Sequence, residues 1–255
     1  MSEQVVLTEV VGTTMVITLN RPTDRNCVDR AMAEAIGGAL DTLDADPTLS
    51  VGVLTGAGGG FCSGMDLKAF AGGELPVAGD RGFAGIAQRS SRKPLLAAIE
   101  GHAVAGGLEI ALACDILIAA RDAHLGIPEV ARGLIAGAGG LLRLPQRVGT
   151  GQAALLALTG TPVSGEQAHR IGLVDQLAEP GQALSEALSL AATIGANAPL
   201  ALAATKAVIR EGFGRSTPEF FEWQRDHLRL VIRSSDAREG ALAFAEKRPP
   251  RWRAQ

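Results

Sequence analysis

Two glutamates, Glu109 and Glu129, stand in segments that otherwise consist of apolar or small residues. A carboxylate in such surroundings is costly to bury unless it has a partner or a chemical task. Two carboxyl groups that meet in one cleft can serve as a general acid and a general base. The alternative is that each glutamate only complements a helix dipole, because both fall in the first turn of an expected helix.

The elements around Glu109 are expected in the order strand, turn, helix. Leu95–Ile99 is an apolar run after a proline, 101–107 is a small-residue turn, and Leu108–Ala113 has helical character. Gly106 and its neighbour then lie at the helix start, where backbone N–H groups lack intrahelical acceptors and the dipole favours negative charge. A carbonyl oxygen that becomes an oxyanion could bind there.

A second strand is expected over Cys114–Ala120, and 126–132 carries Glu129 beside Pro128, which suits a first helical position. The two glutamates are 20 residues apart. They follow successive strands that should be neighbours in a sheet. We therefore expect both carboxyl groups to face one cleft.

The composition bounds the class of protein. With 255 residues, 47% of them hydrophobic and 20% charged, the chain can bury the core of one large domain. Its apolar runs are shorter than a membrane span, and residues 1–10 do not resemble a secretion signal. We therefore expect a soluble cytoplasmic protein. The three cysteines, widely separated, are expected to be reduced thiols.

The charges argue against some ligands and leave others open. The net charge of −3 gives no reason to expect nucleic acid. Residues 201–255 hold 11 Lys/Arg and 7 Asp/Glu, a surplus that could serve an anionic ligand or simply form a solvated helix face. The four histidines lack the i, i+4 spacing of a metal site. The run GAGGGF at 56–61 has Phe61 where a dinucleotide-binding motif needs its third glycine.

The rest of the chain predicts a mixed α/β protein. A β-hairpin is expected over Val5–Asn20, a helix over Asp29–Leu43 and a buried strand over Val51–Leu54, which implies a right-handed parallel crossover. A capped helix is expected over Ser164–Ile171 and a short strand over Gly172–Asp175.

Three helices are expected near the end, at 183–197, 199–211 and 218–245, as a C-terminal helical part.

The runs AxxGxAxAGGLEIALACDILIAA and LGIPEVxxGLIAGAGGLLRLPxxVG resemble the enoyl-CoA hydratase/isomerase (crotonase) family. The similarity extends from NRP near the start to FAEKRPPRW near the end, which is essentially the whole chain. It implies a ββα spiral core domain over 1–195 and a C-terminal helical trimerisation subdomain over 196–255. Trimers, often paired into hexamers, are implied by the same resemblance.

The resemblance also implies roles for particular residues. The backbone N–H groups of Gly106 and Met65 would form an oxyanion hole for a thioester. Glu109 would activate a water molecule, and Glu129 would exchange the proton at C2. Related hydratases often carry Ala in place of Met65 and Gly in place of Ala105, which changes the expected shape of the acyl pocket.

Arg25 and Lys247 match positions that contact coenzyme A in the family; on the residues alone, both are surface charges. Coenzyme A would enter as part of the substrate, so no separate cofactor and no metal is expected. The implied reaction is hydration of a 2-enoyl-CoA. An enoyl-CoA isomerase, another acyl-CoA lyase of this kind and a non-catalytic acyl-CoA-binding homologue remain alternatives.

Overall fold

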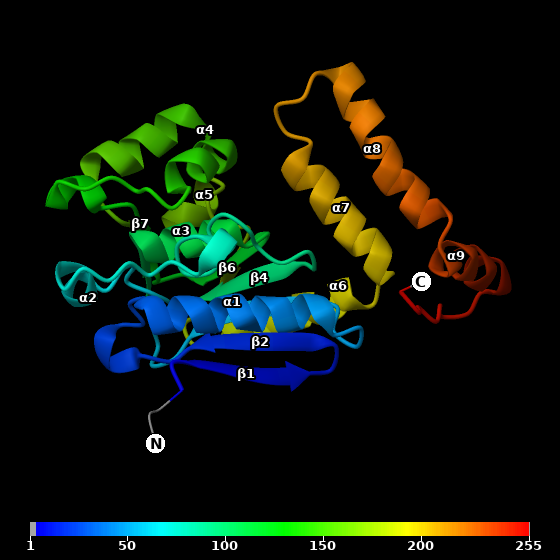
Figure 1. The fold of residues 1–255 in the computed structure, drawn as a ribbon, viewed down its shortest axis with the longest axis horizontal. Coiled ribbons are helices and arrows are strands. Elements are labelled where there is room, and N and C mark those ends of the chain that lie inside the picture. Colours follow the sequence, from blue (N-terminus) through cyan, green and yellow to red (C-terminus); the bar gives the residue numbers. More distant parts are fainter. Residues whose placement is uncertain (1–3, 255) are drawn as a thin grey trace.

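The computed structural model describes residues 4–254 and holds two β-sheets with helices packed around them (Figure 1). The larger sheet has six strands in the order β1-β2-β3-β4-β6-β9. They are β1 Val6–Val11, β2 Thr14–Leu19, β3 Val51–Gly56, β4 Leu95–Ile99, β6 Ile116–Ala120 and β9 Gln176–Ala178. β1 and β2 form an antiparallel hairpin, and every later pairing in this sheet is parallel. The expected hairpin and the parallel crossover to the third strand are confirmed.

A second sheet of three short strands has the order β5-β7-β8. These strands are β5 His102–Val104, β7 His124–Gly126 and β8 Val163–Ser164. β5 follows β4 and precedes a helix, and β7 follows β6 in the same way. These two turns of the chain thus each add one strand to each sheet before the chain becomes helical, which is the expected ββα spiral. The stretch 101–107, expected to be only a turn, contains β5.

The α-helices are α1 Arg30–Ala45, α2 Leu67–Ala71, α3 Gly106–Ala113, α4 Gly140–Thr159, α5 Gly165–Arg170, α6 Ala183–Gly195, α7 Pro199–Glu211, α8 Thr217–Ile232 and α9 Ser235–Glu246. Short 3₁₀ helices are η1 Pro22–Asp24, η2 Gly79–Arg81 and η3 Glu129–Arg132. α4 is interrupted at Gly149, whose φ of +76° is not helical. The helix expected at 218–245 is wrong as one element, because α8 ends at Ile232 and the Ser234 side chain caps α9.

The larger sheet is buried on both faces. Along β4, Leu96 and Ala98 pack against α6, whereas Leu95, Ala97 and Ile99 face the main core with α1 and α3. Alternate side chains of a strand point to opposite faces, so an apolar run such as LLAAI covers both. α6 therefore belongs to this sheet, and its expected place among the C-terminal helices is wrong.

The short strand expected at Gly172–Asp175 is also misplaced, because the pairing with β6 begins at Gln176. The side chain of Asp175 instead accepts a hydrogen bond from Leu117 N, at 2.7 Å, at the edge of β6. The domain boundary at 195/196 stays a prediction.

α7 and α8 stand at one side of the molecule in Figure 1. A cluster of largely buried charges joins α7 to Asp115, two residues beyond the end of α3. Lys206 Nζ lies 2.7 Å from one carboxylate oxygen of Asp115, and Arg210 Nε lies 3.2 Å from the other. Because buried charges are costly without partners, this pairing fixes the position of α7 against the core.

Among residues 4–254, no single helix is long and apolar enough to span a membrane, and α6 with α7 reaches that length only across a 110° bend.

Candidate active site

Glu109 is held by two backbone N–H groups that donate to the same carboxylate oxygen. It lies in the first turn of α3 and is only 3% exposed. Its Oε1 accepts hydrogen bonds from Ala138 N, at 2.7 Å, and from Gly140 N, at 2.9 Å. A Cβ on Gly140 would lie 2.9 Å from Glu109 Cγ, so this approach requires glycine.

Glu129 begins η3 and is 8% exposed. Within residues 4–254 its buried Oε2 has no hydrogen-bond partner. An orphaned buried polar atom is rare and calls for an explanation, of which a catalytic role is one. Pro128 precedes the first residue of η3 rather than occupying it.

The small sheet brings the two glutamates together. β5 and β7 are parallel neighbours that end in register, Val104 opposite Gly126, and Ala105 N donates to the Gly126 carbonyl. α3 and η3 therefore start side by side, as expected. The nearby charge of Glu129 adds to the rise that burial causes in the pKa of Glu109.

The two carboxyl groups have unequal surroundings. Burial raises the pKa of Glu109, and the N–H groups of Gly140 and Ala138 oppose that rise by favouring the carboxylate. Burial also raises the pKa of Glu129, which only its own N–H and the nearby charge of Arg132 oppose. Glu109 is thus better supported as a carboxylate, and Glu129 has an unsupported oxygen that can carry a proton.

The backbone of Gly64 and Met65 lies against the start of α3. A Cβ on Gly64 would be 2.9 Å from the amide nitrogen of Gly106. Val28 fixes this segment, since it donates to the Gly64 carbonyl and accepts from Asp66 N. Within the described residues, neither Met65 N–H nor Gly106 N–H has a protein acceptor. The structure brings together the two donors that the sequence singled out.

Ala105, which directly precedes α3, has φ +52° and ψ −131°. A residue with a Cβ is strained there, at a cost on the order of 1–3 kcal/mol. The substitution of Ala for the family's frequent glycine therefore carries a conformational cost at this turn. Asp66, which follows Met65, caps the start of α2, since its Oδ1 accepts from Lys68 N and Ala69 N.

Phe83 is a site residue that the sequence reasoning missed. A Cβ on Gly106 would lie 2.6 Å from the tip of the Phe83 ring, so the ring rests on the start of α3. Phe83 sits in a turn in which Gly82, Ala84 and Gly85 all have positive φ. The glycines of this stretch signal a turn, but no sequence pattern predicts where the ring points.

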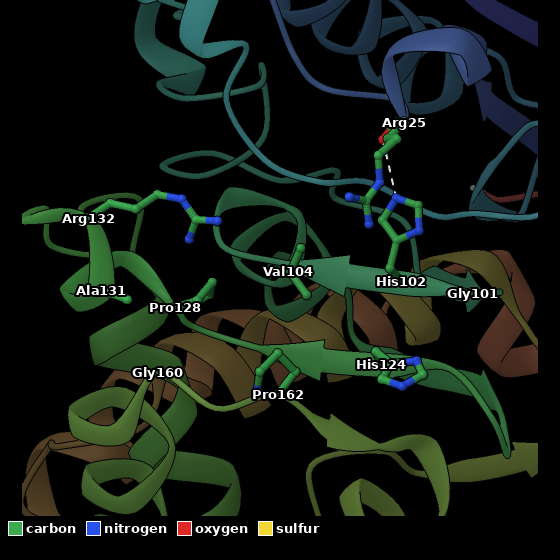
Figure 2. Close-up of a pocket in the computed structure, with 10 residues that line it drawn as sticks. All are labelled: Arg25, Gly101, His102, Val104, His124, Pro128, Ala131, Arg132, Gly160 and Pro162. Atoms are coloured by element: carbon green, nitrogen blue, oxygen red, sulfur yellow. Dashed lines mark hydrogen bonds between the residues drawn. The ribbon is translucent and has the colours of Figure 1, made fainter.

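An open groove of about 640 Å³ lies on the outer side of the small sheet. Figure 2 shows Arg25 and Arg132 on opposite sides of it, with Val104 and Pro128 between them. Arg25 is one of the two basic residues expected at an anionic ligand, and Arg132 was not foreseen. His102 also lines this groove, and burial lowers the pKa of its imidazole.

Lys247, the other expected basic residue, does not line this groove. It is exposed and follows the last turn of α9. Figure 1 places α9 on the opposite side of the molecule from β7, a strand of the groove wall. Within one chain the structure does not bring Lys247 and Arg25 together.

The three cysteines are free thiols. Burial raises the pKa of Cys62 and Cys114 to about 12 and that of Cys27 to about 11. Since the thiolate is the reactive form, all three are expected to be chemically quiet.

We predict that Glu129→Gln stabilises the fold at neutral pH. The pKa of Glu129 is raised from 4.5 in the folded chain, so this carboxyl favours folding below pH 4.5 and loses that effect as pH rises through the folded pKa. The free energy of unfolding of the variant in urea should exceed that of the wild type at pH 7.5. The difference should shrink toward pH 4.5. Glu222→Gln on the exposed face of α8 is the control; an equal difference at both pH values for Glu129→Gln would contradict this account.

Comparison with known proteins gives a consistent assignment. The sequence profile of the enoyl-CoA hydratase/isomerase family matches residues 9–255. A carnitinyl-CoA dehydratase of Salmonella arizonae is 40% identical, with 99% of each chain covered.

Solved structures agree with this assignment. An enoyl-CoA hydratase of Mycobacterium marinum, EchA1, is 55% identical with a TM-score of 0.97, and the match covers 99% of this chain and 100% of that one. A carnitinyl-CoA hydratase of Mycobacterium avium is 40% identical with a TM-score of 0.80, and both chains are covered completely. The chain has the crotonase fold and belongs to the enoyl-CoA hydratase/isomerase family.

Proposed function

We propose that this protein catalyses the reversible addition of water to a 2-trans-enoyl-CoA, which gives a 3-hydroxyacyl-CoA. The observation that carries the proposal is the pair of buried carboxyl groups with unequal support. Glu109 accepts two backbone N–H bonds, and Glu129 keeps a buried oxygen without a partner among residues 4–254. Hydration needs one group that takes a proton from water and another that gives one to carbon.

In the proposed mechanism the thioester oxygen accepts hydrogen bonds from the N–H groups of Gly106 and Met65. Glu109 takes a proton from water while the water oxygen bonds to C3, and the electron pair of the double bond moves to the thioester as an enolate. Glu129 then gives its proton to C2, and a proton passes from Glu109 to Glu129 to restore the site. One oxyanion donor typically contributes about 2.7–4 kcal/mol to the transition state. No step in this sequence uses a metal or a separate cofactor.

The groove on the small sheet is the proposed binding site for the phosphate-bearing part of coenzyme A. Arg25 and Arg132 line it, and their guanidinium groups suit phosphate oxygens. Two residues that line the groove lie next to the proposed reaction site in the sequence. Pro128 directly precedes Glu129, and Val104 lies two residues before the start of α3. The expected contact between Lys247 and coenzyme A stays a prediction. Because Lys247 does not line the groove of its own chain, the Lys247 of a neighbouring copy would have to make this contact.

Isomerisation of the double bond and other crotonase-type lyase reactions are the alternatives within the same site. Isomerisation needs proton transfer at carbon but no attacking water, so a second supported carboxylate such as Glu109 favours hydration. A non-catalytic acyl-CoA-binding role would leave the orphaned Glu129 oxygen unexplained. The relatives named for carnitinyl-CoA add a second acyl group that the experiment must include.

We predict that the purified protein hydrates at least one of the short, medium and long 2-trans-enoyl-CoAs. Loss of the conjugated thioester absorbance measures the rate, and mass spectrometry of the 3-hydroxyacyl-CoA confirms the product. Glu109→Gln and Glu129→Gln should each lower kcat by about a hundredfold or more, because each removes a proton-transfer group. Binding of the acyl-CoA should survive in both variants.

Carnitinyl-CoA and a 3-enoyl-CoA are assayed beside these substrates. Dehydration of carnitinyl-CoA with no hydration of simple enoyl-CoAs would transfer the assignment to that acyl group. Double-bond migration without hydration would make the protein an isomerase. Near-normal rates in either glutamate variant would remove the proposed roles.

We further predict that Phe83 limits the acyl groups that the site accepts, because its ring rests on the donor residue Gly106. Phe83→Leu should raise kcat/KM for a 2-methyl-branched or longer enoyl-CoA, relative to that for crotonyl-CoA, by about tenfold or more. The reason is that the smaller side chain leaves space for one or two more carbon atoms of the acyl group, and one methylene in an apolar pocket changes kcat/KM by about this factor. Phe244→Leu is the control, since Phe244 is 87% exposed on α9. An unchanged substrate ratio in Phe83→Leu would place the acyl chain elsewhere.

We also propose that the chain forms a homotrimer or a dimer of trimers. α8 has no buried side chain within one chain, and Phe221, Leu228 and Ile232, which share one side of the helix at spacings of seven and eleven residues, are exposed. An isolated apolar face of this kind usually meets another protein surface. Light scattering should give three or six times the chain mass of 26.2 kDa, and a monomer would contradict the proposal.

A further inference from the structure

The N–H donors that hold Glu109 belong to the loop 138–140, which ends in the first residue of α4, and one side chain holds this loop. Arg143 lies in the first turn of α4, and its Nη1 lies 3.3 Å from the Ala138 carbonyl. That carbonyl belongs to the peptide unit between the two units that donate to Glu109. The guanidinium is pressed against the loop, because a Cβ on Gly139 would lie 2.3 Å from Nη1.

The second arm of Arg143 reaches the other wall of the site. Its Nη2 donates to the Ala87 carbonyl, and Ala87 N in turn donates to the Phe83 carbonyl at 3.1 Å. One guanidinium therefore connects the loop that positions Glu109 with the turn that carries Phe83.

Arg143 also has an unusual charge environment. Within residues 4–254 no carboxylate lies within 4 Å of it, although burial lowers its pKa. The groups that act on it from neighbouring elements are Arg210 of α7, which disfavours its charge, and Glu109 and Cys114, which favour it. Glu109 in turn is acted on by Arg143 and by Glu129 of η3, with opposite signs.

We propose that Arg143 is the positioning residue for Glu109: its guanidinium fixes the loop that carries both N–H donors and places a positive charge beside the carboxylate. This inference rests on the proposed role of Glu109 as the base in hydration. It assigns a task to a half-buried arginine that neither touches the substrate nor forms an ion pair within 4 Å among the described residues. A partly desolvated cation without a close anion is costly, which a purely structural role does not account for.

Arg147, one turn further along α4, offers a matched control. It too is half-buried and donates to a backbone carbonyl, that of Asp115 at 2.9 Å. It differs in having a carboxylate partner, because its Nη1 lies 2.9 Å from Asp175 Oδ2. Arg143→Met and Arg147→Met therefore remove equivalent helix side chains, and only the first removes a charge beside Glu109.

The first readout is the pH dependence of hydration. Without the Arg143 charge, the pKa of Glu109 rises further, so the acidic limb of the kcat/KM profile should move to higher pH. At neutral pH, kcat should fall by about ten- to a hundredfold with KM nearly unchanged, since the base is misplaced and more often protonated. Arg143→Lys should return the acidic limb toward that of the wild type, and Arg147→Met should leave both the limb and kcat unchanged.

The second readout does not need activity. Carboxyl carbons of ¹³C-labelled glutamate are titrated by NMR, and the Glu109 signal is assigned by its loss in Glu109→Gln. In Arg143→Met this signal should titrate at a higher pH than in the wild type, and in Arg147→Met it should not move. If the wild type fails to hydrate any enoyl-CoA, the proposed function falls, and this titration still tests the link between Arg143 and Glu109.

An unmoved Glu109 titration in Arg143→Met would overturn the inference, as would an unmoved acidic limb in an active wild-type background. Arg143→Gln provides a second neutral variant if Arg143→Met does not fold. Thermal unfolding of each variant separates loss of fold from loss of positioning.

Discussion

The site depends on one interaction, the pair of hydrogen bonds that Ala138 N and Gly140 N donate to the buried carboxylate of Glu109. Without them a carboxyl group that is 3% exposed would be forced into its neutral form by desolvation. With them it can remain ionised without a salt bridge that would block access to it. Backbone donors have the further advantage of being held by the fold rather than by a rotatable side chain.

Much of the surrounding architecture follows from the need to bring that loop to α3. Gly140 leaves no room for a side chain against Glu109, and α4 starts at this residue, so its N–H has no intrahelical acceptor and donates to the carboxylate. On the other side, β5 and β7 end in register, and this alignment places the starts of α3 and η3 next to each other. If the pairing of these strands shifted by one residue, the side chains of the shifted strand would point to the opposite face of the sheet. The starts of α3 and η3 would then no longer be aligned, and the two glutamates would move apart.

The sequence predicted the large elements and the two glutamates because both leave local signals. Apolar runs such as 95–99 identify buried strands, and a carboxylate in an apolar context is conspicuous. β5 left no such signal, because three residues flanked by glycine are too few to show a period. The packing of α6 against the larger sheet could not be predicted either. Its Ala-rich face suits contact with helices as well as with a sheet, and the local sequence does not distinguish these two contacts.

Arg143 and Phe83 were missed for a related reason. An arginine within a helix that also exposes Leu141 and Leu142 has the pattern of a surface charge, and its role depends on a loop that precedes it and on a turn more than fifty residues earlier. The orientation of Phe83 depends on positive φ angles at Gly82 before it and at Ala84 and Gly85 after it, one of them at an alanine. Such conformations are fixed by surrounding contacts rather than by local preference.

These features share a thermodynamic consequence. Glu129 Oε2 has no partner among the described residues, Ala105 and Ala84 adopt conformations that suit glycine, and Arg143 is a half-buried cation without a carboxylate within 4 Å there. Each lowers stability relative to a sequence chosen for stability alone. All of them lie around the start of α3 or the residues linked to it, whereas the ion cluster at Asp115, behind the same helix, is fully paired. These unfavourable groups therefore surround the start of α3, and the paired charges beyond its other end hold that helix in place.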